Sequence, residues 1–235
     1  DYRELRDLPA RAGVSRLSPR LHHGELSARQ VWHAAQGEHG AGGEAFLRQL
    51  VWREFAYHLL YHFPAMADTP LRPEFAAFPW HDEPGRFRAW CCGRTGYPIV
   101  DAGMRELWHT GWMHNRVRMI AASFLIKHLL IDWREGERWF WDTLVDADYG
   151  QNAVNWQWSA GTGVDSNMFV RIMAPLTQSP KFDAAEYIRQ WVPELAHLPE
   201  AAIHDPPLPV RGYPQKIVDH RFARERALAA HAALK

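Results

Sequence analysis

The sequence has very few cysteines: only Cys91 and Cys92 occur in its 235 residues, and they are adjacent. Neighbouring cysteines rarely form a disulfide with each other, because their side chains diverge. A disulfide framework is therefore excluded, and we expect a protein of the reducing cytoplasm. A paired-thiol metal site would need further ligands at a suitable spacing, so no metal is expected.

Long apolar runs and an excess of one charge are also missing. No stretch approaches the roughly 20 apolar residues that cross a bilayer, and no basic-then-apolar leader opens the chain. We therefore expect no contact with a membrane. Lys and Arg together number 27, as do Asp and Glu, whereas a dedicated DNA-coating protein would be more basic. A net charge of zero still allows one basic face.

Strand patterns are almost absent, and helical periodicity dominates the chain. The predicted helices cover 44–63, 98–111, 115–130, 133–144, 184–191 and 219–234. Pro98 suits the start of the second helix, Gly111 its end, and Asp183 suits an N-cap for the fifth. The stretch 37–43 resembles a linker. One all-α domain over residues 1–235 is the natural interpretation.

Against these absences stands an unusual abundance of tryptophan, with 12 Trp beside 11 Phe and 7 Tyr. Proteins use this large side chain for anchoring, stacking and occasionally redox chemistry. A large helical core with some Trp left at the surface explains most of them individually. It does not easily explain those that are set among polar residues.

Two segments combine polar side chains with turns. Segment 13–19, GVSRLSP, offers hydroxyls and backbone amides that can hold phosphate oxygens, although it also suits a plain capping loop. Segment 112–119, WMHNRVRM, sets two Arg, one Asn and one His at the mouth of an apolar helix. That arrangement favours a bound anion or ring, or else a solvated first turn.

A third segment, 146–158, contains two carboxylates and two tryptophans. No further acidic cluster completes a metal site around Asp146 and Asp148. Either carboxylate would instead accept a hydrogen bond from a cofactor ring N–H, or pair with Arg118. Trp156 and Trp158 are two apart in a predicted helix, so they point in different directions, one toward a cofactor and the other toward a cavity.

The fourth segment is 49–55, QLVWREF. Gln49 and Trp52 are three residues apart and share a helix face. A Trp beside a hydrogen-bonding amide is a platform for stacking on a base and reading it. A merely half-buried Trp is the alternative.

Together, and in this order, the segments resemble the photolyase/cryptochrome family from Tyr2 to about His220. The pieces that carry the resemblance are SRLSP at 15–19, WREF at 52–55, TGYPIVDAGMREL at 95–107, GWMHNRVRM at 111–119, IDWREGE at 131–137, NWQW at 155–158, KFD at 181–183 and YIRQWVPEL at 187–195. The resemblance implies a multi-helix domain that holds FAD in a U-shaped form. Family members also carry an N-terminal α/β antenna domain, and this chain starts just after that domain would end. We therefore expect no antenna chromophore here, the domain being either removed or naturally absent.

The resemblance also implies a set of cofactor-binding residues. They are Tyr2, Ser15, Arg16, Leu17, Ser18, Gln49, Arg53, Trp112, Asn115, Arg118, Asp146, Ala147, Asp148 and Asn152. Asp146, paired with Arg118, and Asp148 would bind the isoalloxazine edge and ribityl region. Asn152 would face flavin N5. Repair members of the family have Asn at that position, whereas plant-type cryptochromes tend to have Asp and animal-type ones Cys.

The implied activity is that of a deoxyribodipyrimidine photolyase, a light-driven lyase acting on UV-damaged DNA. Excited reduced flavin would donate an electron to a flipped-out cyclobutane pyrimidine dimer, whose ring splits before the electron returns. A tryptophan chain that reduces the flavin would run from Trp156 through Trp133 to Trp80 at the surface. The DNA-binding residues would be Trp52 and Trp158 as cavity walls, Asn115 and Met119 lining the cavity, and Arg116 and Arg171 near the DNA backbone.

One departure from the family pattern concerns the substrate. Gln49 stands where cyclobutane-dimer photolyases usually have a Glu that contacts the damaged bases; Gln donates and accepts hydrogen bonds but carries no charge. Six-four photolyases often have Gln there, yet they carry a His pair where this chain has His114 and Asn115. Asn115 therefore favours a cyclobutane dimer. A cryptochrome-like photoreceptor without repair, and a non-catalytic module that holds FAD or nucleic acid, are the alternatives.

Overall fold

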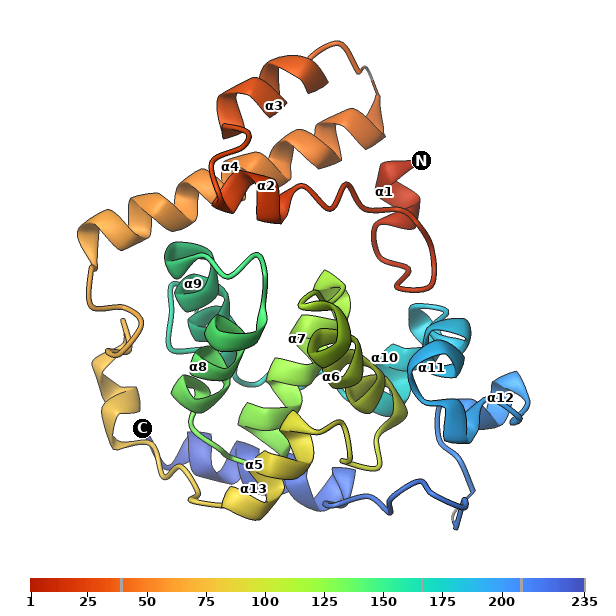
Figure 1. Cartoon of the computed structure of the whole chain (residues 1–235). Helices are drawn as coiled ribbons and strands as arrows, with labels where there is room; N and C mark the ends of the chain where they lie inside the picture. The colour runs from red at the N-terminus through yellow and green to blue at the C-terminus, as the bar shows by residue number, and fades with distance from the viewer. Residues whose placement is uncertain (39, 166, 208, 235) are drawn as a thin grey trace.

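The computed structural model describes residues 1–38, 40–165, 167–207 and 209–234. Over these residues the chain folds into thirteen α-helices joined by loops and short 3-10 or π turns, with no strand (Figure 1). The prediction of an all-α fold is confirmed. None of the described helices combines the length and the apolar character that crossing a membrane requires. Cys91 and Cys92 are both free thiols.

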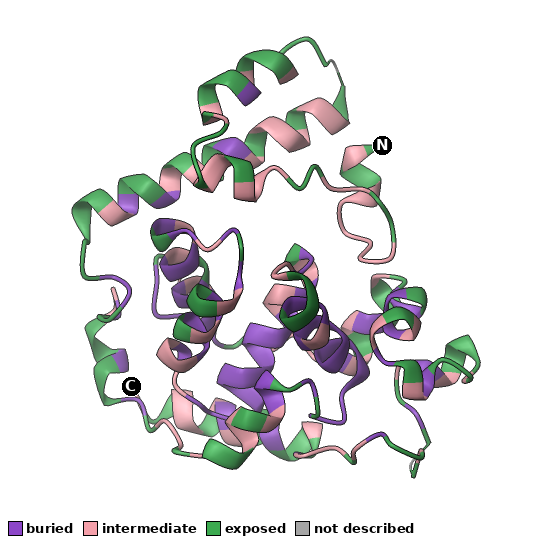
Figure 2. Cartoon of the chain, in the orientation of Figure 1, coloured by how far each residue is buried: buried purple, intermediate pink, exposed green. Residues whose placement is uncertain are grey.

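An N-terminal layer is made by α1 (Tyr2–Leu5), α2 (Ser18–His22), α3 (Ala28–Ala35) and α4 (Ala41–His62). Figure 1 shows this layer along one side of the remaining helices. The helix α4 has 22 residues, of which only Leu50, Ala56 and Leu59 are buried (Figure 2). The layer therefore contributes little to the main hydrophobic core.

The start of α4 corrects the predicted linker over 37–43, because the helix already begins at Ala41 and runs through Gly42 and Gly43. Glycine is a poor helix former, but at Gly43 the backbone of a neighbouring residue packs too closely for a side chain. A Cβ on Gly43 would approach the Glu38 carbonyl oxygen to 2.0 Å, and one on Gly42 would lie 3.6 Å from the Tyr2 nitrogen. The helix therefore starts earlier than the low helix propensity of glycine predicts.

The main core is formed by α5 (Pro84–Cys91), α6 (Pro98–Thr110), α7 (Asn115–Ser123), α8 (Trp133–Thr143), α9 (Tyr149–Ala160), α11 (Ala185–Trp191) and α13 (His220–Ala232). Pro98 begins α6 and Gly111 ends it in the left-handed conformation, both as predicted. Trp90 and Trp133 are among the largest fully buried side chains. Shorter elements complete the chain: η1 (Pro73–Ala77), α10 (Pro175–Lys181), η3 (Pro193–Leu195) and α12 (Glu200–Ile203).

Two further predictions about helix ends were wrong. The helix expected over 115–130 is α-helical only to Ser123, and continues as the π turn η2 (Phe124–His128), in which the Leu129 amide bonds the Phe124 carbonyl. Asp183 does not cap α11, since Ala184 is the N-cap residue. Asp183 instead has φ of 49°, and its amide bonds the Pro180 carbonyl in the turn that ends α10. An N-cap residue typically has an extended backbone, whereas Asp183 is in the left-handed region.

Candidate cofactor site

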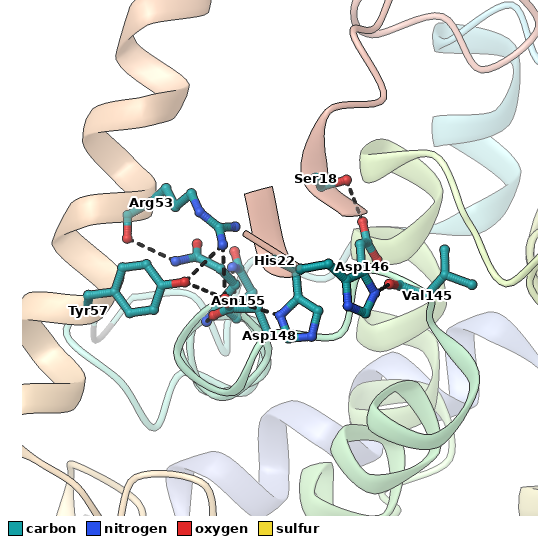
Figure 3. Close-up of polar contacts among 10 residues, drawn as sticks. Ser18, His22, Arg53, Tyr57, Val145, Asp146, Asp148 and Asn155 are labelled. Atoms are coloured by element: carbon teal, nitrogen blue, oxygen red, sulfur yellow. Dashed lines mark hydrogen bonds and ion pairs between the residues drawn. The ribbon is translucent and has the colours of Figure 1, made fainter. Parts of the chain in front are cut away.

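Asp148 is the hub at which the N-terminal layer meets the main body. Its buried carboxylate is the N-cap of α9, accepting the Gln151 amide at 3.0 Å. From α4, Arg53 donates to Asp148 Oδ2 at 2.9 Å, and the Tyr57 hydroxyl donates to the same oxygen. From α2, His22 Nδ1 lies 3.6 Å from it. Figure 3 shows these side chains converging from three elements.

The charge of Asp148 is set by these partners. Burial alone raises the pKa of the carboxyl, but the hydrogen bonds from Tyr57 and the Gln151 amide, with the Arg53 charge, outweigh it and hold the pKa below its usual value. Burial and the bond to Asp148 raise the pKa of Tyr57 to about 12. The tyrosine is therefore a neutral donor and Asp148 an anion at neutral pH.

Asp146, two residues earlier, has one oxygen engaged and one free. Its Oδ2 accepts the Ser18 hydroxyl at 2.6 Å and Arg118 Nη2 at 2.9 Å, which confirms the predicted Arg118 pair. Its Oδ1 is buried and has no hydrogen-bond partner. An unsatisfied buried carboxylate oxygen is costly, so this atom is suited to accept an N–H from a ligand.

Asn152 lies one helical turn further, on the buried side of α9. Its Nδ2 donates to the Glu137 carbonyl at 2.9 Å and to Glu137 Oε1 at 2.8 Å. Burial raises the pKa of Glu137, and the bond from Asn152 lowers it by less. Both amide hydrogens of Asn152 are thereby oriented, and the side chain is held in one position.

The mouth of α7 brings another predicted group together. The Arg16 guanidinium carbon lies 4.3 Å from the Trp112 ring centroid. Arg116 makes a two-pronged ion pair with Asp7, at 2.9 and 2.8 Å. Met119 Sδ lies 3.8 Å from Asn115 Nδ2. A cavity of about 220 Å³ opens here, lined by Asp7, Arg116, Met119, Met173, Gln178, Lys181 and Phe182.

The three predicted redox tryptophans differ in their surroundings. Trp156 is buried in α9, with its ring 5.0 Å from Phe140 and 6.3 Å from Trp90, both edge-on. Trp133 is fully buried at the start of α8. Trp80 is half-buried, 4.1 Å from the Phe78 ring. The graded burial agrees with a path from core to surface.

The other predicted residues are more dispersed. Gln49 is engaged on both ends, since Arg6 donates to its Oε1 at 3.2 Å and its Nε2 donates to the Ala45 carbonyl. Trp52 is 59% exposed, Trp158 is half-buried and Arg171 is exposed. Tyr2 packs edge-on against Phe46, while Ser15 is exposed, and Leu17 and Ala147 are half-buried.

Four residues of the site were not predicted: His22, Tyr57, Glu137 and Trp90. Tyr57 stands four residues after Arg53 on the same helix face, a spacing that was available in the sequence. Glu137 is four residues after Trp133, so it shares that helix face. For His22 and Trp90 the contacts are made between elements distant in the chain, which the local pattern does not reveal. No group of three potential ligands forms a metal site among the described residues.

The fold and this site define a class: an all-helical domain in which two buried carboxylates face a polar junction between layers. The sequence profile of the FAD binding domain of DNA photolyase matches residues 46–233. The chain belongs to the photolyase/cryptochrome family and carries its FAD-binding domain.

Known relatives resemble this chain over its whole length. A deoxyribodipyrimidine photo-lyase of Agrobacterium fabrum is 54% identical over 251 residues, covering 100% of this chain and 52% of that protein. The crystal structure of a bacterial class III photolyase from Agrobacterium tumefaciens has a TM-score of 0.95 at 52% identity, covering 99% of this chain and 52% of that one. A Synechocystis cryptochrome has a TM-score of 0.91 at 35% identity, covering 98% and 51%. The chain thus spans about half the length of these relatives.

The side chains at the junction fit FAD. The free Asp146 Oδ1 is an acceptor for a ring N–H. Arg16 supplies positive charge for a diphosphate, and Trp112 beside it supplies an aromatic face. Arg118 and Ser18 hold Asp146, and Arg53 holds Asp148. Both carboxylates are therefore oriented before the cofactor binds.

Proposed function

We propose that this chain is the FAD-binding, catalytic half of a light-driven photolyase that repairs cyclobutane pyrimidine dimers in DNA, organised as one domain over residues 1–235. The observation that carries the proposal is Asn152 beside the two carboxylates, held by Glu137 on two hydrogen bonds. Repair members of the family have Asn at this position. When bound, FAD supplies the light-driven one-electron chemistry.

The protein's own part is to bind and orient the cofactor. In this proposal, Asp146 accepts a ring N–H through Oδ1 while Arg118 and Ser18 hold Oδ2. Asp148 ties α2 and α4 to the turn before α9, closing the junction around the ligand. The 13–19 loop, with Arg16, receives the diphosphate. Asn152 fixes the hydrogen bonding of the ring edge.

The tryptophans provide the route by which reducing equivalents enter. Trp156, on the same helix as Asn152, is the first member, with Trp133 next and Trp80 as the exit. An electron hops efficiently only over short distances. Burial protects the inner two indoles from water, and the half-buried Trp80 allows the final radical to be reduced from outside.

DNA binding falls to the face around the 220 Å³ cavity. Trp52 and Trp158 offer aromatic surfaces for a flipped-out dimer, and Asn115 and Met119 contact it. Of these four side chains, Met119 lines the cavity. Arg116 and Arg171 contact phosphates. The Asp7 pair neutralises Arg116 in the free protein, so a phosphate has to displace or share that partner.

A light-dependent repair assay tests the proposal. The FAD-loaded protein is reduced, mixed with thymine-dimer DNA and illuminated with near-UV or blue light, with a dark control. We expect intact thymines to return only in the light. Trp158→Ala should lower repair, whereas Trp108→Ala, which alters a 68% exposed tryptophan on α6, should leave it unchanged. Absence of light-dependent repair, with normal flavin photoreduction, would refute the lyase assignment.

A second candidate is a cryptochrome-like photoreceptor without repair. It is supported by the likeness to the Synechocystis cryptochrome and by Gln49, which lacks the charge of the usual Glu and is bonded to Arg6 instead. This candidate predicts flavin photoreduction that depends on Trp133, with no change in dimer content under any illumination. The same assay therefore separates the two.

A further inference from the structure

The loop between α9 and α10, residues 161–174, is buried at its inner side although it carries an exposed arginine. Within the described part of this α9–α10 loop, Met168 and Phe169 are 2% and 0% exposed, while Arg171 points to solvent. Gly161, at the end of α9, allows the close approach, because a Cβ there would lie 2.7 Å from the Phe169 nitrogen. The loop is therefore packed against the helix that carries Asn152.

A buried lysine holds this loop from the opposite side. Lys127, in the π turn η2, is 1% exposed, and its Nζ donates to the Met168 carbonyl at 2.7 Å and to the Arg171 carbonyl at 3.0 Å. The Phe169 ring lies 5.9 Å from Nζ. None of the described carboxylates forms an ion pair with Lys127, and burial lowers its pKa to about 7.

Ser123 adds a second point of attachment one turn earlier on the same segment. Its buried hydroxyl accepts the Met173 amide at 3.2 Å. Ser123 and Lys127 are four residues apart and face the same loop. Three hydrogen bonds thus fix the backbone at residues 168, 171 and 173. These positions include Arg171 itself and one residue on each side of it, while its side chain is exposed.

A charged group is an unusual choice for this location if packing were its only purpose. Burying an amino group away from any counter-charge is unfavourable, above all in its charged form, and methionine would fill similar space without that cost. What the amino group provides is several donors, two of which meet carbonyls three residues apart in a loop that forms no helix there. Since Lys127 is inaccessible, it does not touch DNA itself.

We propose that Lys127 is a positioning residue for DNA binding: it fixes the Arg171 backbone so that the guanidinium meets a DNA phosphate. This inference rests on the proposed function, in which Arg171 contacts the DNA backbone. It assigns Lys127 an effect that passes entirely through Arg171. Ser123 supports the same arrangement through Met173.

The test is a double-mutant cycle of DNA affinity at several salt concentrations. The FAD-loaded protein is titrated in the dark with a fluorescent duplex containing one thymine dimer, using wild type, Lys127→Met, Arg171→Ala and the double variant. One lost phosphate contact lowers the slope of log K against log salt by about 0.9. Raising the salt from 50 to 200 mM weakens DNA binding of every protein in the cycle. For each single variant, the factor by which it weakens should be about 3.5-fold smaller than the factor for wild type.

The double variant should bind as Arg171→Ala does, within about a factor of two, because the two residues act as one unit. The matched control is Lys216→Met, which removes a lysine that pairs with Asp205 and lies outside the loop. Its slope should equal that of wild type. If Lys127→Met leaves the slope unchanged, or weakens binding equally in the Arg171→Ala background, the proposal is wrong.

Two further outcomes are informative. If Lys127→Met fails to fold or to retain FAD, the Ser123→Ala variant replaces it, because it removes only the hydrogen bond to the Met173 amide with little change in volume. Ser123→Ala should lower the salt slope by a smaller amount than a lost phosphate contact does. This decrease must disappear in the Arg171→Ala background, and if it persists the proposal is wrong. If wild type shows no preference for dimer DNA, the proposed repair function is weakened, but the cycle is still measurable on undamaged DNA, because phosphate contacts are independent of sequence. If Arg171→Ala keeps the wild-type slope of log K against log salt, Arg171 makes no phosphate contact, and the positioning role of Lys127 is refuted with it.

Discussion

His114 should make the protein sensitive to acid, and the effect can be isolated by one substitution. The side chain is 1% exposed, its Nδ1 accepts the Arg116 amide at 3.2 Å as the N-cap of α7, and its Nε2 has no partner. Burial, as the largest cause, lowers the pKa of His114 to about 4 from 6.5. The imidazole is therefore neutral in the folded protein at neutral pH.

The sign of the effect follows from proton binding. Between pH 6.5 and 4 the unfolded chain binds a proton at His114 and the folded chain does not, so stability falls as the pH falls through this window. At about 1.36 kcal/mol per pH unit, the loss reaches about 3 kcal/mol at pH 4. That is a large part of the 5–15 kcal/mol that typically stabilises a domain.

The His114→Asn variant removes the titration and keeps the cap, because Asn is a strong N-cap residue. Urea unfolding of both proteins at pH 7.5, 5.5 and 4.5 gives the free energies of unfolding. We expect the two to agree within about 1 kcal/mol at pH 7.5, and wild type to lose about 2–3 kcal/mol more than the variant by pH 4.5. His128, whose pKa burial lowers to about 3, contributes equally to both and cancels. Parallel losses in the two proteins would refute the reasoning.

Four other predictions concern the flavin site and the substrate. Trp133→Phe should block photoreduction of oxidised flavin and leave repair by chemically reduced enzyme mostly intact; equal loss of both would contradict its place in the chain. Trp158→Ala should weaken damaged-DNA binding by about tenfold, on the order of one base–aromatic stack, while FAD content holds; unchanged affinity argues against a dimer cavity there. Glu137→Leu should shift the flavin midpoint potential by freeing Asn152, and Glu137→Gln should restore it; identical potentials would remove the link. Gln49→Glu should raise the repair yield per absorbed photon, which a lower yield would contradict.

The elements predicted from sequence are those whose signals are local. Pro98 and Gly111 mark the two ends of α6 because each restricts or permits particular backbone angles. The helix over 44–63 was predicted, but its first turn from Ala41 and the π turn after Ser123 were missed, because no local pattern in the sequence marks either. Asp183 suits a cap by residue type, but its backbone conformation is fixed by the end of α10.

The site was predictable to the extent that its segments resemble a known family. The Arg118–Asp146 pair followed from that resemblance and is present. The roles of Glu137 and Lys127 could not be predicted from the sequence, because an isolated Glu or Lys in a helix predicts a solvated surface residue. They are distinguished by burial and by their hydrogen-bond partners: Glu137 accepts from Asn152, and Lys127 donates to two loop carbonyls.

The sparse burial of α4 links cofactor loading to folding. Beside the small apolar cluster that includes Leu59 and Ala153, the N-terminal layer meets the body largely through polar contacts, among them those at Asp148, Asp146 and Arg116. Such an interface opens at a lower free energy than a packed core. If FAD contacts both the layer and the body, as proposed above, it stabilises only the form in which the two are in contact, by RT ln(1 + [L]/Kd), and this stabilisation grows with the free FAD concentration. Under that proposal, the free energy that keeps this layer in place depends on the free FAD concentration as well as on the sequence.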